Sequence, residues 1–504
     1  MDNCILLILS HHKVKSLLLD LRASFARPIV TIILWDRIHD NLDISQEEYE
    51  SIGPVYSLPK HYRRISQQLK NMTMHELDEL QASLEKSLNV RNNGLVVSSD
   101  RNFRNISDYR TARELQICNM SLVKLVFEEH SFINVMAGRE DYLRNLACDY
   151  ALSIGVPAHE FVHTRHCGMR MVALDCDGHY VGFQQAFDTL CAGGEQSYDA
   201  HLLASADAQY EYFLSKPIMP RFAVDGARSF VRSLASVFTT GVKSVVENAR
   251  MYRRNLYDRI SGELTSPWRV LSKWPAKAVR MLALDHTTLV YSEPTAGEKY
   301  LYVPMHMSPE CVDMYYGRDY SLHESFIAEL ARRVPSQYCL YVKENSAMVG
   351  QRPLSFYNRL NSLYNVKMIH HNVDTFDLIN DCAAVISVTG TAGWEAYLMN
   401  KPVVVLGNVF YDSLPGVLRA SIYDHGFSTN VSCYIDTFVP DMEERRQAMR
   451  ACFICSTELG VEVGMGDMEN ESKCSSHYAK ILVGLAEQAR ALAPPKVDAT
   501  WPKT

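Results

Sequence analysis

The segment Thr389-Gly390-Thr391-Ala392-Gly393 combines the residue types that bind a phosphate group. It follows an apolar, strand-like run and opens a helical pattern, so backbone N–H groups, threonine hydroxyls and the positive end of a helix can face an anion. Glu395 falls in the first turn of that helix, where a carboxylate can accept hydrogen bonds from ribose hydroxyls. An ordinary turn explains the same residues equally well, with Thr391 as the N-cap and Glu395 stabilising the helix dipole.

Three more loops in the same half of the chain follow strand-like runs and carry polar side chains. His306 and Glu310 follow the run 300–305, Lys343 and Arg352 follow 338–343, and Asn408 follows 402–406. Because ligands of α/β sheets bind outside the carboxyl ends of the strands, we expect these side chains to converge on the phosphate-binding segment. His306, Lys343 and Arg352 would then offset the charge of a leaving phosphate. Each of the three is also compatible with a solvated surface position.

Three residues of the N-terminal half are candidates for acid/base or nucleophilic chemistry: Asp100, Glu140 and His163. Asp100 follows the apolar run 94–98, which we predict to be a buried strand that ends at the cleft, and it is the preferred candidate. A carboxylate or imidazole in this place can give or take a proton, and a carboxylate can also act as a nucleophile. All three are also typical of polar residues that end ordinary strands.

The cysteine and histidine pattern does not predict a metal site. Thirteen cysteines are scattered along the chain, and Cys452 with Cys455 is the one pair at CxxC spacing, without a second pair to complete a zinc site. The neighbouring His11 and His12 have no carboxylate at ligand spacing. We therefore expect reduced cytosolic thiols and no structural zinc site.

Composition restricts the class of protein further. A chain of 504 residues is too long for one compact core, and 47% hydrophobic with 22% charged residues is typical of a globular enzyme. The net charge of −7 does not fit a basic nucleic-acid-binding protein. No uncharged apolar run reaches the roughly 18–20 residues of a membrane span, and the start of the chain lacks the positive charge of a signal peptide. A cytoplasmic location is therefore expected.

The alternation of apolar runs and helical patterns predicts two α/β domains, each a doubly wound, Rossmann-like parallel sheet. In the first, strands at 4–10 and 29–35 flank a helix at 14–25, and Asp177-Gly178 favours a hairpin over 171–183. We predict the following division of the chain: a Rossmann-like domain at 1–198, a helical inter-domain region at 199–298, a second Rossmann-like domain at 299–430 and a helical tail at 431–504.

The segment 225–280 differs from the rest of the chain in charge. It holds eleven Lys/Arg and four Asp/Glu, a local balance of +7, and Trp268 and Trp274 lie near its end. Basic side chains are attracted to anionic lipid and tryptophan prefers the membrane interface, so we predict peripheral contact with the inner face of the cell membrane. A solvated helical linker whose tryptophans pack between domains is the alternative.

Four segments together resemble the capsule polysaccharide biosynthesis family, which contains the bacterial β-Kdo transferases: 302–310, 341–344, 388–396 and 401–411. The resemblance covers 299–420 well and the N-terminal half more loosely, through 99–101 and 151–165. It implies a GT-B glycosyltransferase that needs no metal, with the nucleotide-sugar on the C-terminal domain, the acceptor on the N-terminal domain and CMP-Kdo as a candidate donor. Members commonly carry a His-Pro pair after the Lys-Glu of the second segment, whereas this chain has Asn345 and Ser346.

The sequence therefore predicts a cytosolic glycosyltransferase that transfers a sugar from a nucleotide donor to a glycan or glycolipid of a surface polysaccharide. The phosphate would lie on the segment 389–393, the ribose near Glu395, and Asp100 would act as base or nucleophile. Two alternatives remain open. A nucleotide-sugar epimerase or hydrolase would share the two-domain fold, and a non-catalytic scaffold of the polysaccharide machinery is favoured by Asn345 and Ser346.

Overall fold

The computed structural model describes most of both α/β units. The described residues are 3–9, 22–23, 28–34, 53–90, 93–98, 100, 103, 106, 108–164, 170–215, 280, 284, 290–308, 310, 312–458, 480, 483–485 and 488. Most of the predicted helix at 14–25, the segment 225–279 with its two tryptophans, and most of the chain after 458 lie outside these residues.

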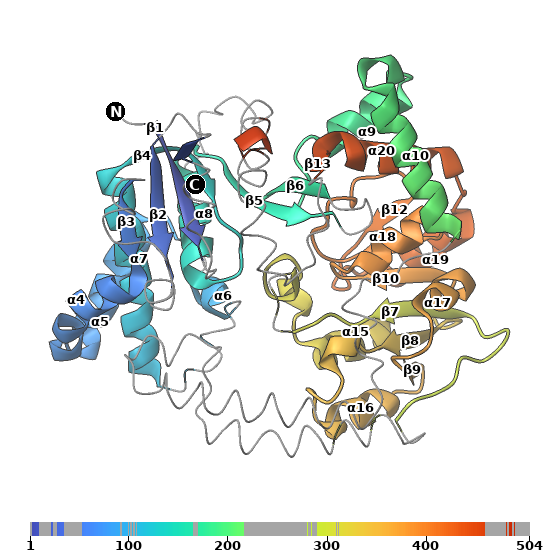
Figure 1. Ribbon diagram of the computed structural model, residues 1–504. Helices are drawn as coiled ribbons and strands as arrows, with labels where there is room; N and C mark the ends of the chain where they lie inside the picture. Colours follow the sequence, from blue (N-terminus) through green and yellow to red (C-terminus); the bar gives the residue numbers. More distant parts are fainter. Residues whose placement is uncertain are drawn as a thin grey trace, which may run out of the picture.

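A seven-stranded sheet organises the N-terminal half (Figure 1). Its strands are β1 (Asn3–Leu9), β2 (Ile29–Ile33), β3 (Val55–Ser57), β4 (Ser131–Met136), β5 (Ala158–His163), β6 (Arg170–Asp175) and β13 (Ser456–Glu458), in the order β13-β6-β5-β4-β1-β2-β3. The strands from β3 to β5 pair in parallel, whereas β6 is antiparallel to both β5 and β13. β1 and β2 read as continuous apolar runs because both faces of a parallel sheet are covered.

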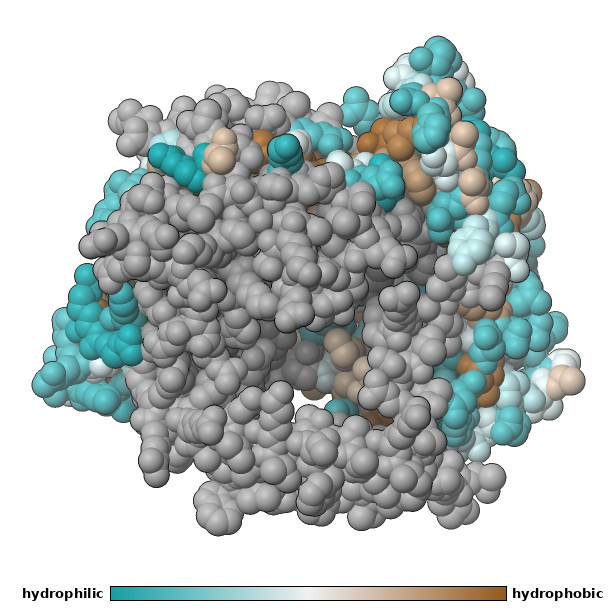
Figure 2. Space-filling model, in the orientation of Figure 1, coloured by the Kyte–Doolittle hydropathy of each residue, from teal (hydrophilic) through white to brown (hydrophobic). Residues whose placement is uncertain are grey.

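Helices α4 (Leu58–Asn71), α7 (Tyr109–Glu129) and α8 (Tyr142–Ser153) pack on this sheet, and α5 (Met74–Ser87) packs on α7. The first two are separate because Thr73 caps α5, in a capping box with Glu76. Their outer surface is hydrophilic, as the teal colour over α4 and α5 in Figure 2 shows. None of the described helices is long and apolar enough to cross a membrane.

The predicted strand at 94–98 is wrong: this segment is the short helix α6 (Asn93–Ser98). A short apolar run does not by itself distinguish a strand from a buried helix. Tertiary contacts decide the outcome, because the side chain of Asn93 accepts from the hydroxyl of Tyr142 at 2.6 Å and donates to Gln116 at 3.0 Å. These bonds hold the segment against α7 and α8 rather than in the sheet.

The predicted hairpin over 171–183 is partly wrong. Its turn is present, with the amide of Asp175 donating to the carbonyl of His179 and Gly178 at a φ of 91°. Tyr180 then makes only a single bridge to Leu174, and helix α9 (Phe183–Cys191) begins three residues later. The full hairpin forms instead between β5 and β6.

The C-terminal half is built on a six-stranded, fully parallel sheet. Its strands are β7 (Tyr300–Pro304), β8 (Cys339–Lys343), β9 (Val366–Ile369), β10 (Ala384–Ser387), β11 (Val403–Val405) and β12 (Val417–Arg419). Their order, β12-β11-β10-β7-β8-β9, is the doubly wound Rossmann arrangement, in which the chain reverses its direction of winding between β7 and β10. The prediction of two Rossmann-like units is confirmed.

Helices α15 (His323–Arg333), α16 (Leu354–Asn361), α17 (Thr375–Asp381), α18 (Thr391–Leu398) and α19 (Phe427–Thr437) connect or flank these strands (Figure 1). Helix α20 (Met442–Cys455) packs against α9 and α10 (Ala200–Ser215) and leads directly into β13. The chain therefore passes from the N-terminal half to the C-terminal half after β6, and it returns to the N-terminal sheet at β13. The two crossings lie side by side. The predicted boundaries at 198, 298 and 430 stay predictions.

Arg170 connects β6 to the end of α20 at this crossing point. Its guanidinium donates to the carbonyls of Phe453 and Ser456 at 3.1 and 2.7 Å, and to the hydroxyl of Ser456 at 2.8 Å. It also lies over the ring of Phe453, 4.7 Å from the ring centroid. The first residue of β6 thus binds the end of α20 to the N-terminal sheet.

Candidate functional site

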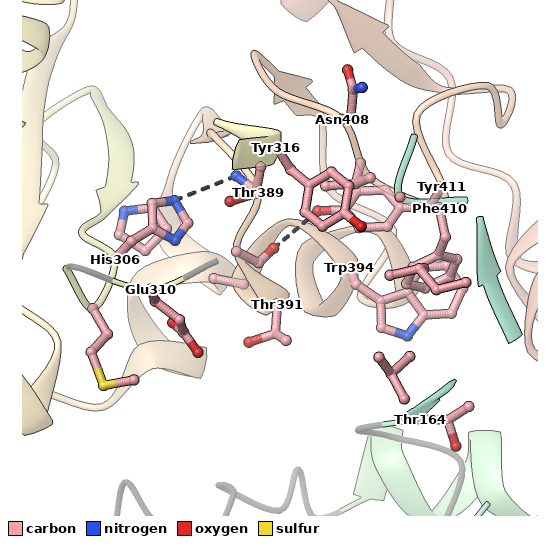
Figure 3. A pocket seen from close by; sticks show the side chains of 18 of the residues that line it. Thr164, His306, Glu310, Tyr316, Thr389, Thr391, Trp394, Asn408, Phe410 and Tyr411 are labelled. Atoms are coloured by element: carbon pink, nitrogen blue, oxygen red, sulfur yellow. Dashed lines mark hydrogen bonds between the residues drawn. The ribbon is translucent and has the colours of Figure 1, made fainter. Parts of the chain in front are cut away.

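A cavity of about 270 Å³ lies where the two halves meet, at the carboxyl ends of β5, β7 and β10. From the N-terminal half it is lined by Val162, His163 and Thr164, and from the second sheet by residues that follow β7, β10 and β11. β7 and β10 flank the winding reversal of the second sheet, which is where ligands of doubly wound sheets bind. Figure 3 shows His306, Glu310 and Thr391 on one side of the pocket and Trp394 and Phe410 on the other.

Two glycines at the junction of β10 and α18 have close contacts: Gly390 lies in the turn, and Gly393 lies in the first turn of the helix. The amide of Gly390 donates to the hydroxyl of Ser387 at 3.0 Å, which tightens the turn. A Cβ on Gly390 would lie 2.8 Å from Cε1 of His306, and one on Gly393 would collide with the hydroxyl of Tyr411. Any larger residue would therefore displace a pocket wall, which is why small residues are needed here.

The first turn of α18 presents amides to the pocket. The N–H groups of Thr391 and Ala392 have no acceptor among the described residues, and both residues line the cavity. His306 lies beside them, and its Nε2 accepts from the amide of Thr389 at 3.4 Å (Figure 3). Amides and helix dipole together favour an anion at this point.

The structure brings seven of the predicted site residues to the pocket: His163, His306, Glu310, Thr389, Gly390, Thr391 and Asn408. Six lie elsewhere: Asp100, Glu140, Lys343, Arg352, Gly393 and Glu395. Among the described lining residues there is no lysine or arginine, and Glu310 is the single carboxylate. Attraction for an anion therefore comes from amides, hydroxyls and imidazoles.

Asp100 is buried in the N-terminal half, at 1% exposure. Its carboxylate accepts from the amide of Tyr142 at 2.5 Å and from the amide of Phe103 at 3.1 Å, so it holds the start of α8. Glu140 is paired with Arg144 at 2.8 Å. Neither residue lines the pocket, whereas His163, at the end of β5, does.

Lys343 is the last residue of β8 and is buried, at 6% exposure. Its Nζ donates to the carbonyl of Val373 at 2.5 Å and to the hydroxyl of Thr375 at 2.7 Å. Burial lowers the pKa of this ammonium to about 8, although the charges of Asp374 and Glu395 oppose the fall. Glu395 itself is buried, at 5% exposure.

An aromatic wall forms the other side of the pocket and was not predicted. Tyr180 and Phe410 stack face to face, with ring centroids 3.9 Å apart and planes 3° apart. Trp394 packs edge-on against Phe410 at 4.9 Å, and Tyr316 also lines the cavity. Tyr180 and Tyr316 lie in segments without a sequence motif, so no local signal in the chain marks them.

The sequence over residues 313–422 matches the family described as "Capsule polysaccharide biosynthesis protein". A search of curated proteins found no match. Among solved structures, the chain is similar to the β-Kdo 2,7 transferase KpsC of Thermosulfurimonas dismutans, with 12% identity over 65% of this chain and 79% of that one, at a TM-score of 0.30.

It is also similar to MnaA of S. aureus in complex with UDP, with 9% identity over 89% of this chain and 91% of that one, at a TM-score of 0.25. A third similar structure is the UDP-GlcNAc 2-epimerase of Methanocaldococcus jannaschii, with 10% identity over 90% and 100% of the chains and a TM-score of 0.24. Likenesses this distant carry no conclusion about activity. The segment 313–422, which includes the turn between β10 and α18, is therefore similar to the capsule polysaccharide biosynthesis proteins.

Proposed function

We propose that the protein is a glycosyltransferase of surface or capsular polysaccharide biosynthesis, which transfers a sugar from a nucleotide donor to a glycan or glycolipid. The observation that carries this proposal is the placement of the turn 389–393. It lies inside the family match and lines a pocket at the winding reversal of a Rossmann sheet, opposite a strand end of the other half. A donor on one side and an acceptor on the other would meet there.

In this reaction the donor phosphate binds the first-turn amides of α18 and the hydroxyls of Thr389 and Thr391. The aromatic wall of Trp394 and Phe410 offers an apolar surface for the less polar part of the substrate. His163 approaches from the N-terminal half, so its imidazole is the candidate base for the acceptor hydroxyl. Asp100, Glu140, Lys343, Arg352 and Glu395 support the elements that hold these groups.

The family resemblance favours CMP-Kdo as the donor and transfer without a metal. A phosphate-bearing donor is supported by the amides of Thr391 and Ala392, which the first turn of α18 presents to the pocket. The segment 225–280 is proposed to bring the protein to a membrane-bound acceptor, and it lies outside the described residues apart from Arg280.

The test is a panel of CMP-, UDP- and GDP-sugars, each incubated with the purified protein, with and without a glycan acceptor and with and without EDTA. Transfer to the acceptor that survives EDTA is the expected result. Release of free sugar or a changed sugar without acceptor would indicate the hydrolase or epimerase. Absence of binding to every nucleotide would contradict the proposal and favour the scaffold.

A further inference from the structure

The indole ring of Trp394 brings a hydrogen-bond donor to the pocket. Trp394 lies on α18, lines the cavity and is 3% exposed. Its Nε1 has no acceptor among the described residues, and an indole N–H can only donate. Figure 3 shows this nitrogen at the edge of the ring that is turned toward Thr164. A donor without an acceptor costs free energy in a folded protein, so this N–H points to an oxygen that the protein itself does not supply.

The faces of the indole ring are covered by other aromatic rings. Tyr397 stacks on Trp394, with ring centroids 5.5 Å apart and planes 11° apart. Phe410 and Tyr411 pack against the same ring, at 4.9 and 5.6 Å between centroids. With 3% of its surface exposed, Trp394 has no open face on which a ligand could lie. A ligand therefore reaches this side chain at its edge, where the N–H is.

Two neighbouring hydroxyls of the pocket differ from this N–H because they have partners inside the protein. The hydroxyl of Thr164 donates to the carbonyl of Arg170 at 3.3 Å, and the hydroxyl of Tyr411 donates to the carbonyl of Gly390 at 3.0 Å. Both protons are therefore in use. On the described part of this wall, the indole N–H of Trp394 is a side-chain donor that remains for a ligand.

The position of Trp394 on α18 indicates which part of a ligand meets the N–H. Helical side chains point back toward the helix N-terminus, so the indole lies over the first turn, whose amides at Thr391 and Ala392 face the pocket. A phosphate on those amides brings the group bonded to it toward the indole edge. That edge is turned toward Thr164, in the half of the protein on which the acceptor is proposed to bind. The adjoining group is therefore the saccharide and not the nucleoside.

We propose that Trp394 is a specificity-determining residue, whose Nε1–H donates a hydrogen bond to an oxygen of the saccharide. This inference rests on the glycosyltransferase function proposed above and adds a contact that distinguishes a nucleotide-sugar from a bare nucleotide. The oxygen belongs to the transferred sugar or to the sugar that receives it, since both meet where the two halves face each other. A saccharide that lacks this oxygen leaves the donor unpaired and binds more weakly.

The first experiment needs no ligand. The chain has five tryptophans, so protein labelled with ¹⁵N-tryptophan gives few indole signals. Trp394→Phe assigns the signal of Trp394, and single Trp→Phe variants at the other four positions assign it by elimination if that variant does not fold. In the wild type the proton on Nε1 should exchange with water within seconds. Protection for hours in D₂O would show that the N–H is closed off from the cavity, and it would overturn the inference whatever the activity of the protein.

The second experiment follows the same indole signal during titration with CMP, UDP, their sugar-bearing forms and a free glycan. The signal should move with a nucleotide-sugar and not with the matching bare nucleotide. Movement with the glycan alone would assign the oxygen to the acceptor. Movement with bare CMP or UDP would contradict the proposed contact. If a ligand binds and the signal does not move, this inference fails and the proposed function stands; if no ligand binds, both fail.

Trp394→Phe keeps an aromatic ring and removes the donor. The ratio of nucleotide-sugar affinity to bare-nucleotide affinity, measured by calorimetry, should fall roughly threefold to tenfold for a neutral oxygen and further for a carboxylate oxygen. Tyr397→Phe is the matched control, because Tyr397 lies on the same helix and does not line the cavity. Its ratio should stay within about twofold of the wild type. An unchanged ratio in folded Trp394→Phe would refute the specificity role.

Discussion

Nε2 of His179 lies 3.3 Å from Oδ1 of Asp412, although 233 residues separate the two in the chain. Nδ1 of the same ring lies 3.6 Å from Asp175, and Asp412 is bound on its other side by Arg419. The turn after β6 is thereby attached to the loop after β11, which carries Asn408 and Phe410 into the pocket. A charged histidine thus holds two walls of the site together.

This contact predicts a pH dependence of stability. Hydrogen bonds to Asp175 and Asp412 raise the pKa of His179 to about 10, above its ordinary value of 6.5. A group whose pKa is raised on folding stabilises the fold fully below its unfolded pKa, and this contribution is lost as the pH rises through the folded value. The difference in melting temperature between wild type and His179→Gln should therefore be largest near pH 6.5 and vanish above pH 10.

His75→Gln is the control for that series, because His75 forms an exposed pair with Glu79. Its melting temperature should follow the wild type at every pH. If the difference in melting temperature between wild type and His179→Gln stays constant from pH 6.5 to 10.5, the imidazole of His179 is uncharged in the folded protein.

Lys343→Met tests whether Lys343 contributes to folding stability or to nucleotide binding. The pKa of Lys343 is lowered by burial to about 8, so the native state binds fewer protons than the unfolded chain between pH 8 and 10.5, and stability from this group rises with pH there. In Lys343→Met the free energy of unfolding should no longer show this rise with pH. Chemical denaturation at pH 7.5 and pH 10 measures it. Nucleotide affinity should change less than about threefold, and a loss of tenfold or more would place the ammonium at the phosphate.

Gly390→Asp should abolish nucleotide binding in a folded protein. Its Cβ would press on His306, and its carboxylate would bring negative charge to an anion site. Gly94→Asp is the matched control, because a Cβ at Gly94 meets no atom within 4 Å. Calorimetry with CMP and UDP measures the effect, and unchanged affinity in Gly390→Asp would make the turn purely structural.

Asp100→Asn and His163→Asn should distinguish a residue that stabilises the fold from one that takes part in catalysis. Asp100→Asn turns an acceptor of two backbone amides into a group with a single acceptor oxygen, so the free energy of unfolding should fall by roughly 1–3 kcal/mol. Its turnover per folded molecule should be nearly normal. His163→Asn should fold normally and lose about 10²-fold or more in turnover. The reverse pattern would restore Asp100 as the catalytic group.

The charged segment 225–280 is tested with vesicles. Co-sedimentation with liposomes that contain anionic lipid is expected at low salt and should decrease at high salt, since each basic residue near such a surface contributes about 1 kcal/mol. Charge reversal at Arg269, Lys273 and Lys277 should release the protein while activity on a soluble acceptor persists. Binding that ignores both salt and lipid charge, or no binding at all, would favour a solvated linker.

The sequence by itself determined the type and position of most elements in the C-terminal half. The apolar runs at 300–305, 338–343, 366–369, 383–388 and 402–406 correspond to β7, β8, β9, β10 and β11. The segment 389–393 also follows a strand and opens a helix, as predicted. These features are local. A parallel strand that is buried on both faces is a continuous apolar run, and a helix has apolar residues at helical spacing, so both can be recognised in a short stretch of sequence.

Only the tertiary structure decided which loops meet and where their side chains lie. His306 reaches Thr389 across 83 residues because β7 and β10 are neighbours in the sheet, and the spacing of residues does not encode that order. Lys343 and Arg352 lie at or after the end of the same strand, yet the first binds the carbonyl of Val373 and the second binds the buried carboxylate of Glu344. Tyr180 joins the pocket by stacking on Phe410, and β13 pairs with β6 although its first residue lies 286 positions after the first residue of β6. Long-range contacts of this kind depend on packing free energies summed over the whole fold, which no short stretch of sequence contains.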